Sequence, residues 1–282
     1  MEIISKIKNI REIIYKKRFE NKSIGYVPTM GYLHKGHLSL IKKARLENDI
    51  VVVSIFVNPT QFGPDEDLES YPRDLDRDAS LCEKEGVDYI FNPSVDEMYD
   101  KDYDTYVEVE SDITNKLCGK SRDGHFKGVT SVVSKFFNVI DPDRAYFGKK
   151  DYQQLVVIKK MVRDLNFNID IIGCPIVREE DGLAMSSRNT YLTQEQRKDA
   201  LILNKSLKQA EKLILDGERK KEVIKKKIIE NIEKIDYADI DYVEILDAKN
   251  LSEIDKIDRD VVIALAVTIG KPRLIDNIIV EV

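Results

Sequence analysis

The 282-residue sequence lacks features that would define several classes of protein. It has no continuous apolar run long enough to cross a bilayer, and its first 17 residues alternate apolar residues with lysines at helical spacing. It has no basic excess, since the net charge is −6 and the isoelectric point is about 5.4. We therefore expect no signal peptide, no membrane span and no nucleic-acid partner. Small anionic ligands remain compatible with this charge, because helix N-termini and a few local cations bind them.

Cysteine is also scarce, and the residues present form no pair. Cys82, Cys118 and Cys174 are widely spaced and odd in number, and none belongs to a CxxC motif. This usage is typical of buried thiols in a reducing compartment. The sequence therefore predicts a cytoplasmic protein.

Several catalytic signatures are missing as well. The sequence contains neither GxxxxGK[ST] nor GxGxxG, no His–Cys cluster with metal-binding spacing, and no serine or cysteine in a nucleophile elbow. Asp74, Asp76 and Asp78 are interpreted as a solvated helix start rather than as metal ligands, so the metal ligands stay unassigned. An enzyme with this sequence would run acyl chemistry without a covalent enzyme intermediate.

Hydrophobic periodicity predicts a doubly wound α/β domain with a parallel sheet over residues 1–176. The continuous apolar run at 49–58 is typical of a parallel strand that is buried on both faces. Strands and helices alternate along this whole region, which is the pattern of such a fold. The expected strands are 24–28, 49–58, 87–93, 144–148 and 168–177, and the expected helices are 6–17, 38–46, 131–140 and 152–165.

The pattern changes after Val177, where a polar segment without apolar periodicity begins. Helices followed by consecutive strands then predict a small α+β domain over residues 177–282, with a mostly antiparallel sheet. A short joint beside a polar loop suits two hinged domains that enclose a site. The expected helices are 193–216 and 219–234, and the expected strands are 241–248, 261–270 and 273–282.

The segment VPTMGYLHKGHLSLI contains two of the three histidines, His34 and His37, on either side of Gly36. It follows a predicted strand and opens a predicted helix, at the edge of a parallel sheet where open α/β folds bind ligands. Glycine lets a phosphate approach the backbone, and side chains three apart at a helix start point to one side. Two surface histidines in a loop would also fit. The position favours a pair of hydrogen-bond donors to one phosphate.

The segment GLAMSSRNTYL lies between the two predicted domains. Ser186 and Ser187 offer hydroxyls, and Arg188 offers a planar cation that binds phosphate oxygens in bidentate fashion. Thr193 and Gln196 form a plausible capping box for the next helix, which leaves the upstream residues without a structural role. We interpret the segment as a loop that closes over a triphosphate and holds the departing pyrophosphate. A solvated capping turn is the alternative.

The segment FGKKDYQQL again joins a predicted strand to a predicted helix. Gly148 permits close approach of a ligand, and Lys150 is a cation that neutralises phosphate. Asp151 is the natural N-cap of the helix that begins at residue 152. Gln154 falls one turn inside that helix, where its amide suits recognition of a hydroxyl or a carboxylate.

Two further segments carry polar side chains near predicted strand ends or helix starts. In FVNPTQFGP, Asn58 and Gln61 supply neutral amides, and an Asn-Pro turn explains Asn58 but not Gln61. In SRDGHFKGVTSVV, Arg122 and the third histidine, His125, stand between glycines. This last segment fits a loop near the ligand crevice and a plain turn before a helix equally well.

Together these motifs resemble the pantoate–β-alanine ligase (pantothenate synthetase) family over roughly the whole chain. The HxGH element alone indicates only the broader nucleotidyltransferase superfamily, and the combination in this order is far more specific. The departures are small, because Lys149 stands where Glu is common and Lys35 is at a variable position. The family's metal-contacting acidic stretch carries Arg77 here, so no metal ligands are transferred. The matching motifs are PTMGxLHxGH, VNPxQF, RxxHFxGV, FGxKDYQQ and LAMSSRN.

The resemblance implies a Rossmann-like domain that binds ATP and a small C-terminal lid domain, in a cytoplasmic homodimer. His37 matches the family's proton donor, which we interpret mainly as a phosphate stabiliser. Gln61 and Gln154 match the two glutamines that hold pantoate, with Asn58, Arg122 and His125 nearby. The residues implied at the nucleotide are Met30, Gly31, His34, Gly36, His37, Gly148, Lys150, Asp151, Val177, Met185, Ser186, Ser187 and Arg188.

The activity implied by the resemblance is ATP-dependent condensation of pantoate with β-alanine, with Mg²⁺, in the pathway to coenzyme A. Pantoate attacks the α-phosphate of ATP to give pantoyl adenylate and pyrophosphate, and β-alanine then displaces AMP. One alternative is an adenylyltransferase of the same superfamily that acts on a phosphorylated acceptor. Paired neutral glutamines favour a hydroxy acid over such an acceptor. Another alternative is a non-catalytic nucleotide sensor, which the intact motifs disfavour.

Overall fold

The structure is a computed structural model that describes residues 1–64 and 66–282. The chain folds into two compact units. The N-terminal unit comprises Met1–Glu110, Arg122–Lys149 and Val157–Pro175. The C-terminal unit comprises Ser111–Ser121, Lys150–Val156 and Ile176–Val282, so it includes two segments from the first 176 residues. The domain boundary at residue 176 stays a prediction.

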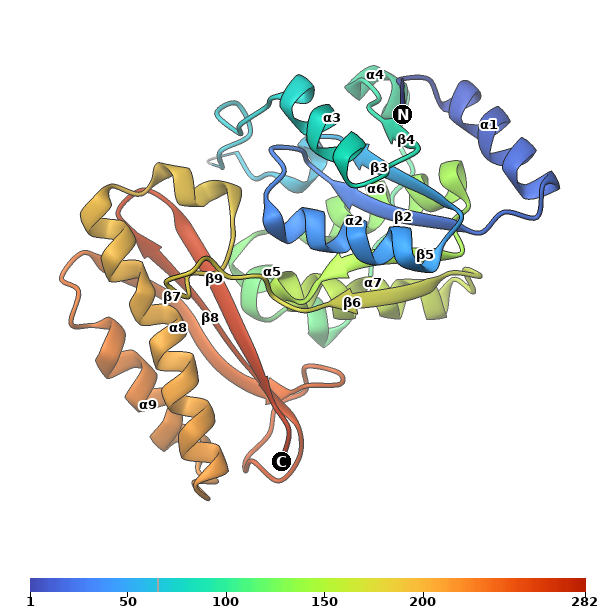
Figure 1. The fold of residues 1–282 in the computed structure, drawn as a ribbon. Helices are drawn as coiled ribbons and strands as arrows, with labels where there is room; N and C mark the ends of the chain where they lie inside the picture. Colours follow the sequence, from blue (N-terminus) through green and yellow to red (C-terminus); the bar gives the residue numbers. More distant parts are fainter. Residues whose placement is uncertain (65) are drawn as a thin grey trace. The chain divides into compact units, whose positions relative to one another are not determined.

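Among the described residues, the N-terminal unit contains one sheet of six parallel strands (Figure 1). The strand order is β1-β4-β3-β2-β5-β6. Every residue of β3 is buried, as the continuous apolar run predicts. Because β2 pairs with β3 on one side and β5 on the other, the winding reverses at β2. The strands are β1 (Glu2–Ile4), β2 (Ile24–Thr29), β3 (Ile50–Ile55), β4 (Tyr89–Phe91), β5 (Arg144–Gly148) and β6 (Asp170–Cys174).

Helices cover both faces of this sheet. On one face, Leu40 and Ile41 of α2 (Lys35–Glu47) and Cys82 of α3 (Leu75–Lys84) pack with buried residues of the central strands. On the other face, the rings of Phe136 and Phe137 in α6 (His125–Ile140) lie 5.9 and 6.4 Å from that of Tyr26. Helix α1 (Ile7–Phe19) packs beside α6, and α4 (Val95–Met98) and α7 (Tyr152–Asp164) complete the longer list of helices.

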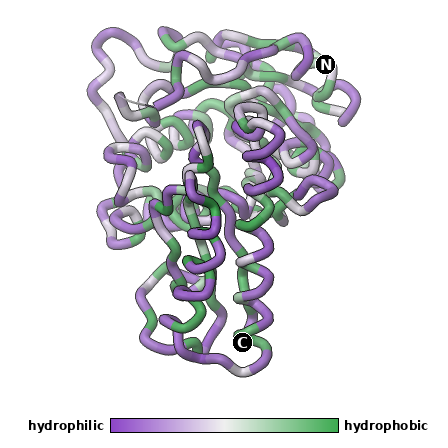
Figure 2. The backbone as a smooth tube through the Cα atoms, turned by 90° about the vertical axis from the view of Figure 1, so that its left-hand side faces the viewer, coloured by the Kyte–Doolittle hydropathy of each residue, from purple (hydrophilic) through white to green (hydrophobic). Residues whose placement is uncertain are grey.

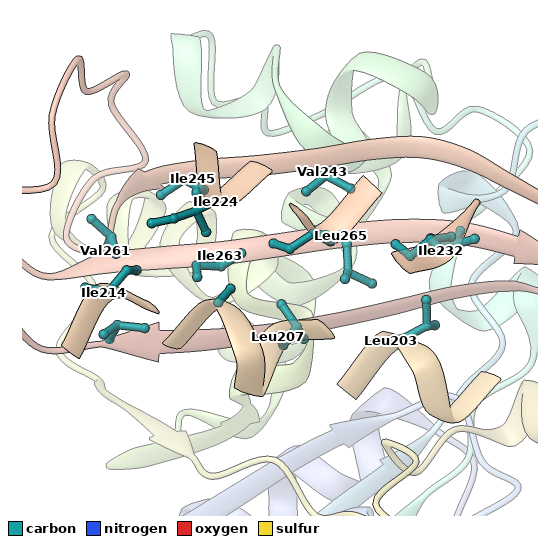
Figure 3. Packing of buried hydrophobic residues seen from close by; sticks show 14 of the residues in the cluster. Leu203, Leu207, Ile214, Ile224, Ile232, Val243, Ile245, Val261, Ile263 and Leu265 are labelled. Carbon is teal, nitrogen blue, oxygen red and sulfur yellow. The ribbon is translucent and has the colours of Figure 1, made fainter. Parts of the chain in front are cut away.

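The C-terminal unit contains an antiparallel sheet covered by two helices. The strands β7 (Ala238–Asp247), β8 (Val261–Ile269) and β9 (Arg273–Val280) pair in that order. Side chains of α8 (Gln194–Leu215) and α9 (Lys221–Ile232) point at the sheet, as Figure 3 shows for the labelled residues. Figure 2 shows hydrophilic and hydrophobic residues alternating along the helices, as expected of helices with one buried face. The short elements α5 (Leu117–Ser121) and η2 (Asp112–Thr114) also belong to this unit.

This architecture confirms the predicted fold class, a doubly wound parallel sheet and a smaller α+β part. The capping box of Thr193 and Gln196 is also confirmed. Helix boundaries were less accurate, because α6 begins at His125 rather than 131 and α2 begins at Lys35 rather than 38. Strand β1 and helix α3 were not predicted as elements. None of the described helices combines the length and apolar content that a bilayer crossing requires.

Candidate active site

The carboxyl edge of the parallel sheet gathers the candidate residues of the N-terminal unit. The loop after β2 begins at Met30, the turn after β3 carries Asn58 and Gln61, and β5 ends at Gly148. Strands β2 and β5 are the neighbours at which the winding reverses. Loops at such a point form the ligand crevice of open α/β sheets.

His34 and His37 stack against each other at the start of α2. Their ring centroids lie 4.0 Å apart, with the planes inclined by 30°. His34 is the N-cap, and its Nδ1 accepts a hydrogen bond from the Gly36 amide at 3.2 Å. His37 Nδ1 accepts from the amide of His34 at 3.3 Å, which completes a reciprocal capping box. The predicted pair on one side of the helix start is therefore present.

These contacts fix which ring nitrogen carries the proton. A backbone amide can only donate, so each Nδ1 must be the unprotonated acceptor. The proton of each neutral imidazole then resides on Nε2, which makes Nε2 a donor. The helix N-terminus adds a partial positive charge beside both rings. The pair therefore presents two oriented N–H donors, which is chemistry suited to a phosphate.

A buried carboxylate anchors the loop that precedes the histidines. Asp78, on α3, is fully buried and accepts from the amides of Tyr32 at 2.6 Å and Leu33 at 2.7 Å. Its neighbour Arg77 donates to the Leu33 carbonyl at 2.8 Å and lies over the Tyr32 ring at 5.0 Å. Burial raises the pKa of Asp78, against the lowering effect of these amides and of Arg77.

The prediction of a solvated helix start was therefore wrong for Asp78 and correct for the exposed Asp74. Asp74 caps α3 by accepting from the Arg77 amide. Asp78 lies three residues after Leu75 and four before the buried Cys82, so helical spacing places it on the inner face. This spacing is the signal that could have identified it.

Gly31 must be a glycine for two independent reasons. Its φ is +84°, a region that side chains disfavour. A Cβ at this position would also lie 2.9 Å from Ile55 Cγ2 and 3.0 Å from Asp78 Oδ2. The loop after β2 therefore fits closely between the end of β3 and helix α3.

The predicted substrate amides lie next to each other in the turn after β3. Asn58 Nδ2 donates to Gln61 Oε1 at 3.1 Å, and Gln61 Nε2 lies 3.2 Å from Met30 Sδ. Gln61 therefore faces a residue predicted to contact the nucleotide. Asn58 is almost fully buried, whereas Gln61 is only half-buried.

Arg122 and His125 form one network with Glu66 beneath this turn. Arg122 donates to both carboxylate oxygens of Glu66, each at 2.6 Å. His125 lies 3.0 Å from Arg122 through Nε2 and 2.9 Å from the Gln61 carbonyl through Nδ1. Burial raises the pKa of Glu66, but the hydrogen bonds and charge of Arg122 outweigh it, and the pKa is lowered overall. The pair thus has a structural role, and its predicted role toward substrate stays a prediction.

The C-terminal unit contains Lys150, Asp151 and Gln154. A 3₁₀ turn, η3 (Lys149–Asp151), precedes α7 and runs directly into it. The carbonyl of Lys150 accepts from Asn277 Nδ2 at 2.8 Å, which ties the turn to β9. The buried neighbour Gln153 binds the carbonyls of η2 and α5, and Gln154 is half-buried.

The segment from Val177 to Arg188 has more internal structure than the predicted loop. The Met185 amide donates to the Val177 carbonyl at 3.0 Å, and Arg178 bridges to Ala184 in a short antiparallel pair. The base of this hairpin is fixed by Arg178, which donates to both oxygens of the buried Asp276 at 2.6 and 3.0 Å.

The expectation that the serines lack a structural role was wrong for Ser186. Its hydroxyl accepts from the Arg188 amide at 3.3 Å and caps the 3₁₀ helix η4 (Ser187–Tyr191). Ser187 is buried at the first position of that helix. The backbone here therefore holds Ser186, Ser187 and Arg188 within one turn of chain.

Metal-binding residues do not cluster in the parts of the chain that the structure describes. No group of three or more His, Cys, Asp or Glu side chains is arranged to hold a metal ion within residues 1–64 and 66–282. Asp78 already accepts two amide hydrogen bonds. A magnesium ion that enters with ATP fits this arrangement, because Mg²⁺ is commonly held by phosphate oxygens, water and one or two carboxylates.

The fold and the site define an α/β protein with a phosphate-binding crevice at the switch point of its parallel sheet. Comparison with known proteins then identifies the family. Residues 2–279 match the family model of pantoate–beta-alanine ligase, and the chain belongs to this family of enzymes. A pantothenate synthetase of Clostridium botulinum is 59% identical over 277 residues, 98% of each chain. One of Thermotoga neapolitana is 58% identical over 279 residues, 99% of each chain.

Solved structures agree with this assignment. Pantothenate synthetase from Thermus thermophilus superimposes with a TM-score of 0.94 at 42% identity and 99% coverage of both chains. Pantoate–beta-alanine ligase from Francisella tularensis, complexed with beta-gamma ATP and beta-alanine, gives a TM-score of 0.80 at 38% identity. That comparison covers 99% of this chain and 97% of the other.

Proposed function

We propose that this enzyme condenses (R)-pantoate with β-alanine through a pantoyl-adenylate intermediate, releasing AMP and pyrophosphate. The observation that carries the proposal is the stacked pair of His34 and His37, whose Nε2–H groups are fixed as donors at the start of α2. Family membership supplies the substrates, since the Francisella relative was solved with an ATP analogue and β-alanine.

Chemistry explains why an adenylate is needed. A carboxylate does not accept an amine directly, because oxide is a poor leaving group. In the first step, a pantoate oxygen attacks the α-phosphorus of ATP, and the bond from that phosphorus to the bridging oxygen of pyrophosphate breaks. Negative charge develops on the α-phosphate and on pyrophosphate, where oriented N–H donors stabilise it. In the second step, the amine of β-alanine displaces AMP and forms the amide.

The residues of this chain would divide the work between the nucleotide and pantoate. His34 and His37 would donate to the phosphates, and Gln61 and Gln154 would hold pantoate, with Asn58, Arg122 and His125 in support. The C-terminal domain, residues 177–282, would act as a lid that keeps water from the adenylate. The other residues proposed at ATP are Met30, Gly31, Gly36, Gly148, Lys150, Asp151, Val177, Met185, Ser186, Ser187 and Arg188.

The proposal includes the setting of the reaction. Mg²⁺ would enter with ATP and neutralise the triphosphate. The cysteines Cys82, Cys118 and Cys174 are all free and buried, which agrees with a cytoplasmic protein. Assembly as a homodimer rests on the family resemblance, and light scattering of the purified protein would measure it.

Isotope exchange between pyrophosphate and ATP tests the first step. The purified protein is incubated with MgATP and labelled pyrophosphate, with and without pantoate and without β-alanine. We expect label in ATP only when pantoate is present, because formation of the adenylate is reversible. Exchange that ignored pantoate would contradict the proposal.

The same assay separates the alternatives. An adenylyltransferase would exchange only with its own phosphorylated acceptor and would give no AMP on addition of β-alanine. A nucleotide sensor would bind ATP without exchange under any of these conditions. The ligase is expected to release AMP and form the amide when β-alanine is added.

A further inference from the structure

The amide of Asn58 is satisfied on every side by neighbouring groups. Its Oδ1 accepts from the hydroxyls of Tyr99 at 2.7 Å and Thr60 at 3.0 Å. Its Nδ2 donates to Gln61 Oε1 at 3.1 Å and to the carbonyl of Gly128 at 3.2 Å. Two acceptor sites and two donor protons are thus all used, which is the full capacity of an amide side chain.

This arrangement determines which way Asn58 is turned. The carbonyl of Gly128 can only accept, so the NH₂ group of Asn58 must face it. The oxygen of Asn58 then faces Tyr99 and Thr60, whose hydroxyls can both donate to it. Turning the amide by 180° would place two acceptors against each other and leave the buried Asn58 without good partners.

The orientation of Asn58 sets that of Gln61 in turn. Because Asn58 offers an N–H to Gln61, the oxygen of the Gln61 amide must face Asn58. The NH₂ group of Gln61 then faces the opposite way, toward Met30 of the loop after β2. Gln61 therefore presents a donor on the side of the predicted nucleotide loop, and a group bound there must be an acceptor.

Tyr99 stands at the far end of this chain of contacts. It follows α4, lies against Tyr103 with ring centroids 4.9 Å apart, and is half-buried. Burial is the main cause that raises the pKa of Tyr99 to about 12. Its hydroxyl therefore keeps its proton near neutral pH and remains a donor to Asn58.

We propose that Tyr99 is a positioning residue that acts through Asn58 to hold the Gln61 amide with its NH₂ group toward pantoate. The inference rests on the proposed function for its substrate, and it specifies that the partner atom on pantoate is an acceptor, a carboxylate or hydroxyl oxygen. Tyr99 has no contact with the substrate in this account. Removal of its hydroxyl leaves Asn58 Oδ1 with Thr60 alone.

A double-mutant cycle tests the relay. The variants are Tyr99→Phe, Gln61→Ala and the two combined, with Tyr106→Phe as the matched control, because Tyr106 is exposed and its ring lies over Lys127. We expect Tyr99→Phe to raise the KM for pantoate roughly tenfold while the KM for ATP stays constant, as loss of a buried hydrogen bond implies. In the Gln61→Ala background the same change should have an effect of less than about twofold.

The cycle has clear contrary outcomes. An equal factor in both backgrounds, an unchanged KM for pantoate, or a parallel rise in the KM for ATP would overturn the relay. A protein without pantoate-dependent activity would instead refute the proposed function. In that case a measurement that needs no substrate still decides the relay.

That measurement is the NMR signal of the Gln61 side-chain NH₂ group in protein labelled with ¹⁵N-glutamine, assigned by its loss in Gln61→Ala. We expect Tyr99→Phe to shift or broaden this signal and Tyr106→Phe to leave it in place. An identical Gln61 signal in Tyr99→Phe and the unaltered protein would overturn the relay whatever the substrate is.

Discussion

At the scale of single residues, buried polar side chains determine the geometry of the candidate site. The sequence indicated the histidine pair and the amides, because their motifs stand at strand ends. It did not indicate Asp78 as the anchor of the loop after β2, since an acidic cluster before a helix is usually solvated. Burial of one carboxylate among three is decided by packing of α3 on the sheet, which periodicity alone does not specify.

Asp78→Asn is expected to lower kcat by roughly tenfold or more and to reduce stability by about 1–3 kcal/mol. An asparagine accepts one amide hydrogen bond through its oxygen, but its NH₂ group then faces the second amide donor. Steady-state kinetics and urea unfolding measure the two effects. Asp74→Asn is the control and should be neutral, because asparagine caps a helix as well as aspartate does. Equal effects of the two substitutions would refute the anchoring role.

His34→Ala and His37→Ala are each expected to lower the rate of pantoate-dependent exchange by about 10²–10³-fold, the usual cost of removing one oriented donor. Binding of pantoate should change far less, and calorimetry measures it. Lys35→Ala is the control between them, because this side chain is exposed. Unchanged turnover in either histidine variant would reject the role in phosphate stabilisation.

The Glu66–Arg122 pair predicts a dependence of stability on pH. The folded pKa of Glu66 is lowered, so its stabilising contribution is present above the unfolded pKa of about 4.3 and is lost as the pH falls through the folded value. We therefore expect Glu66→Gln to be less stable than the unaltered protein at pH 7, with the difference disappearing in acid. Urea unfolding at several pH values measures this, and a difference that is constant with pH would contradict it.

At the scale of elements, hydrophobic periodicity located most strands and helices, and glycines displaced some boundaries. The predicted helix at 131–140 begins six residues earlier because Gly128 lies inside α6, although glycine disfavours helices. Packing explains this choice, since α6 approaches the turn η1 (Pro59–Gln61) closely. A Cβ on Gly128 would lie 2.2 Å from the Thr60 carbonyl oxygen.

Gly128→Ala should therefore displace the turn that carries Gln61. We expect a raised KM for pantoate and a loss of stability of about 1–3 kcal/mol, as for other overpacked sites. Kinetics and thermal unfolding measure both. Gly63→Ala is the matched control, because its nearest contact would be an ordinary 3.7 Å to Glu66 Cγ. Normal pantoate kinetics in Gly128→Ala would show that the close approach does not position Gln61.

At the scale of the whole molecule, the sequence predicted both sheets but not their strand orders. Alternating strands and helices indicate a parallel sheet, and consecutive strands indicate an antiparallel one. The position of β2 between β3 and β5 depends on non-local pairing, which local patterns do not encode. The chain also crosses between the two units more than once, as residues 111–121 and 150–156 show, and no change of composition marks these crossings.

The central claim is that pantoate is activated as an adenylate, and transfer of oxygen tests it most directly. Pantoate labelled with ¹⁸O in its carboxylate is incubated with the enzyme, MgATP and β-alanine, and the products are analysed by mass spectrometry. We predict that one ¹⁸O atom appears in the phosphate of AMP, because the oxygen that attacks the α-phosphorus leaves with AMP when the amide forms. Unlabelled AMP, or label in inorganic phosphate instead, would contradict the account.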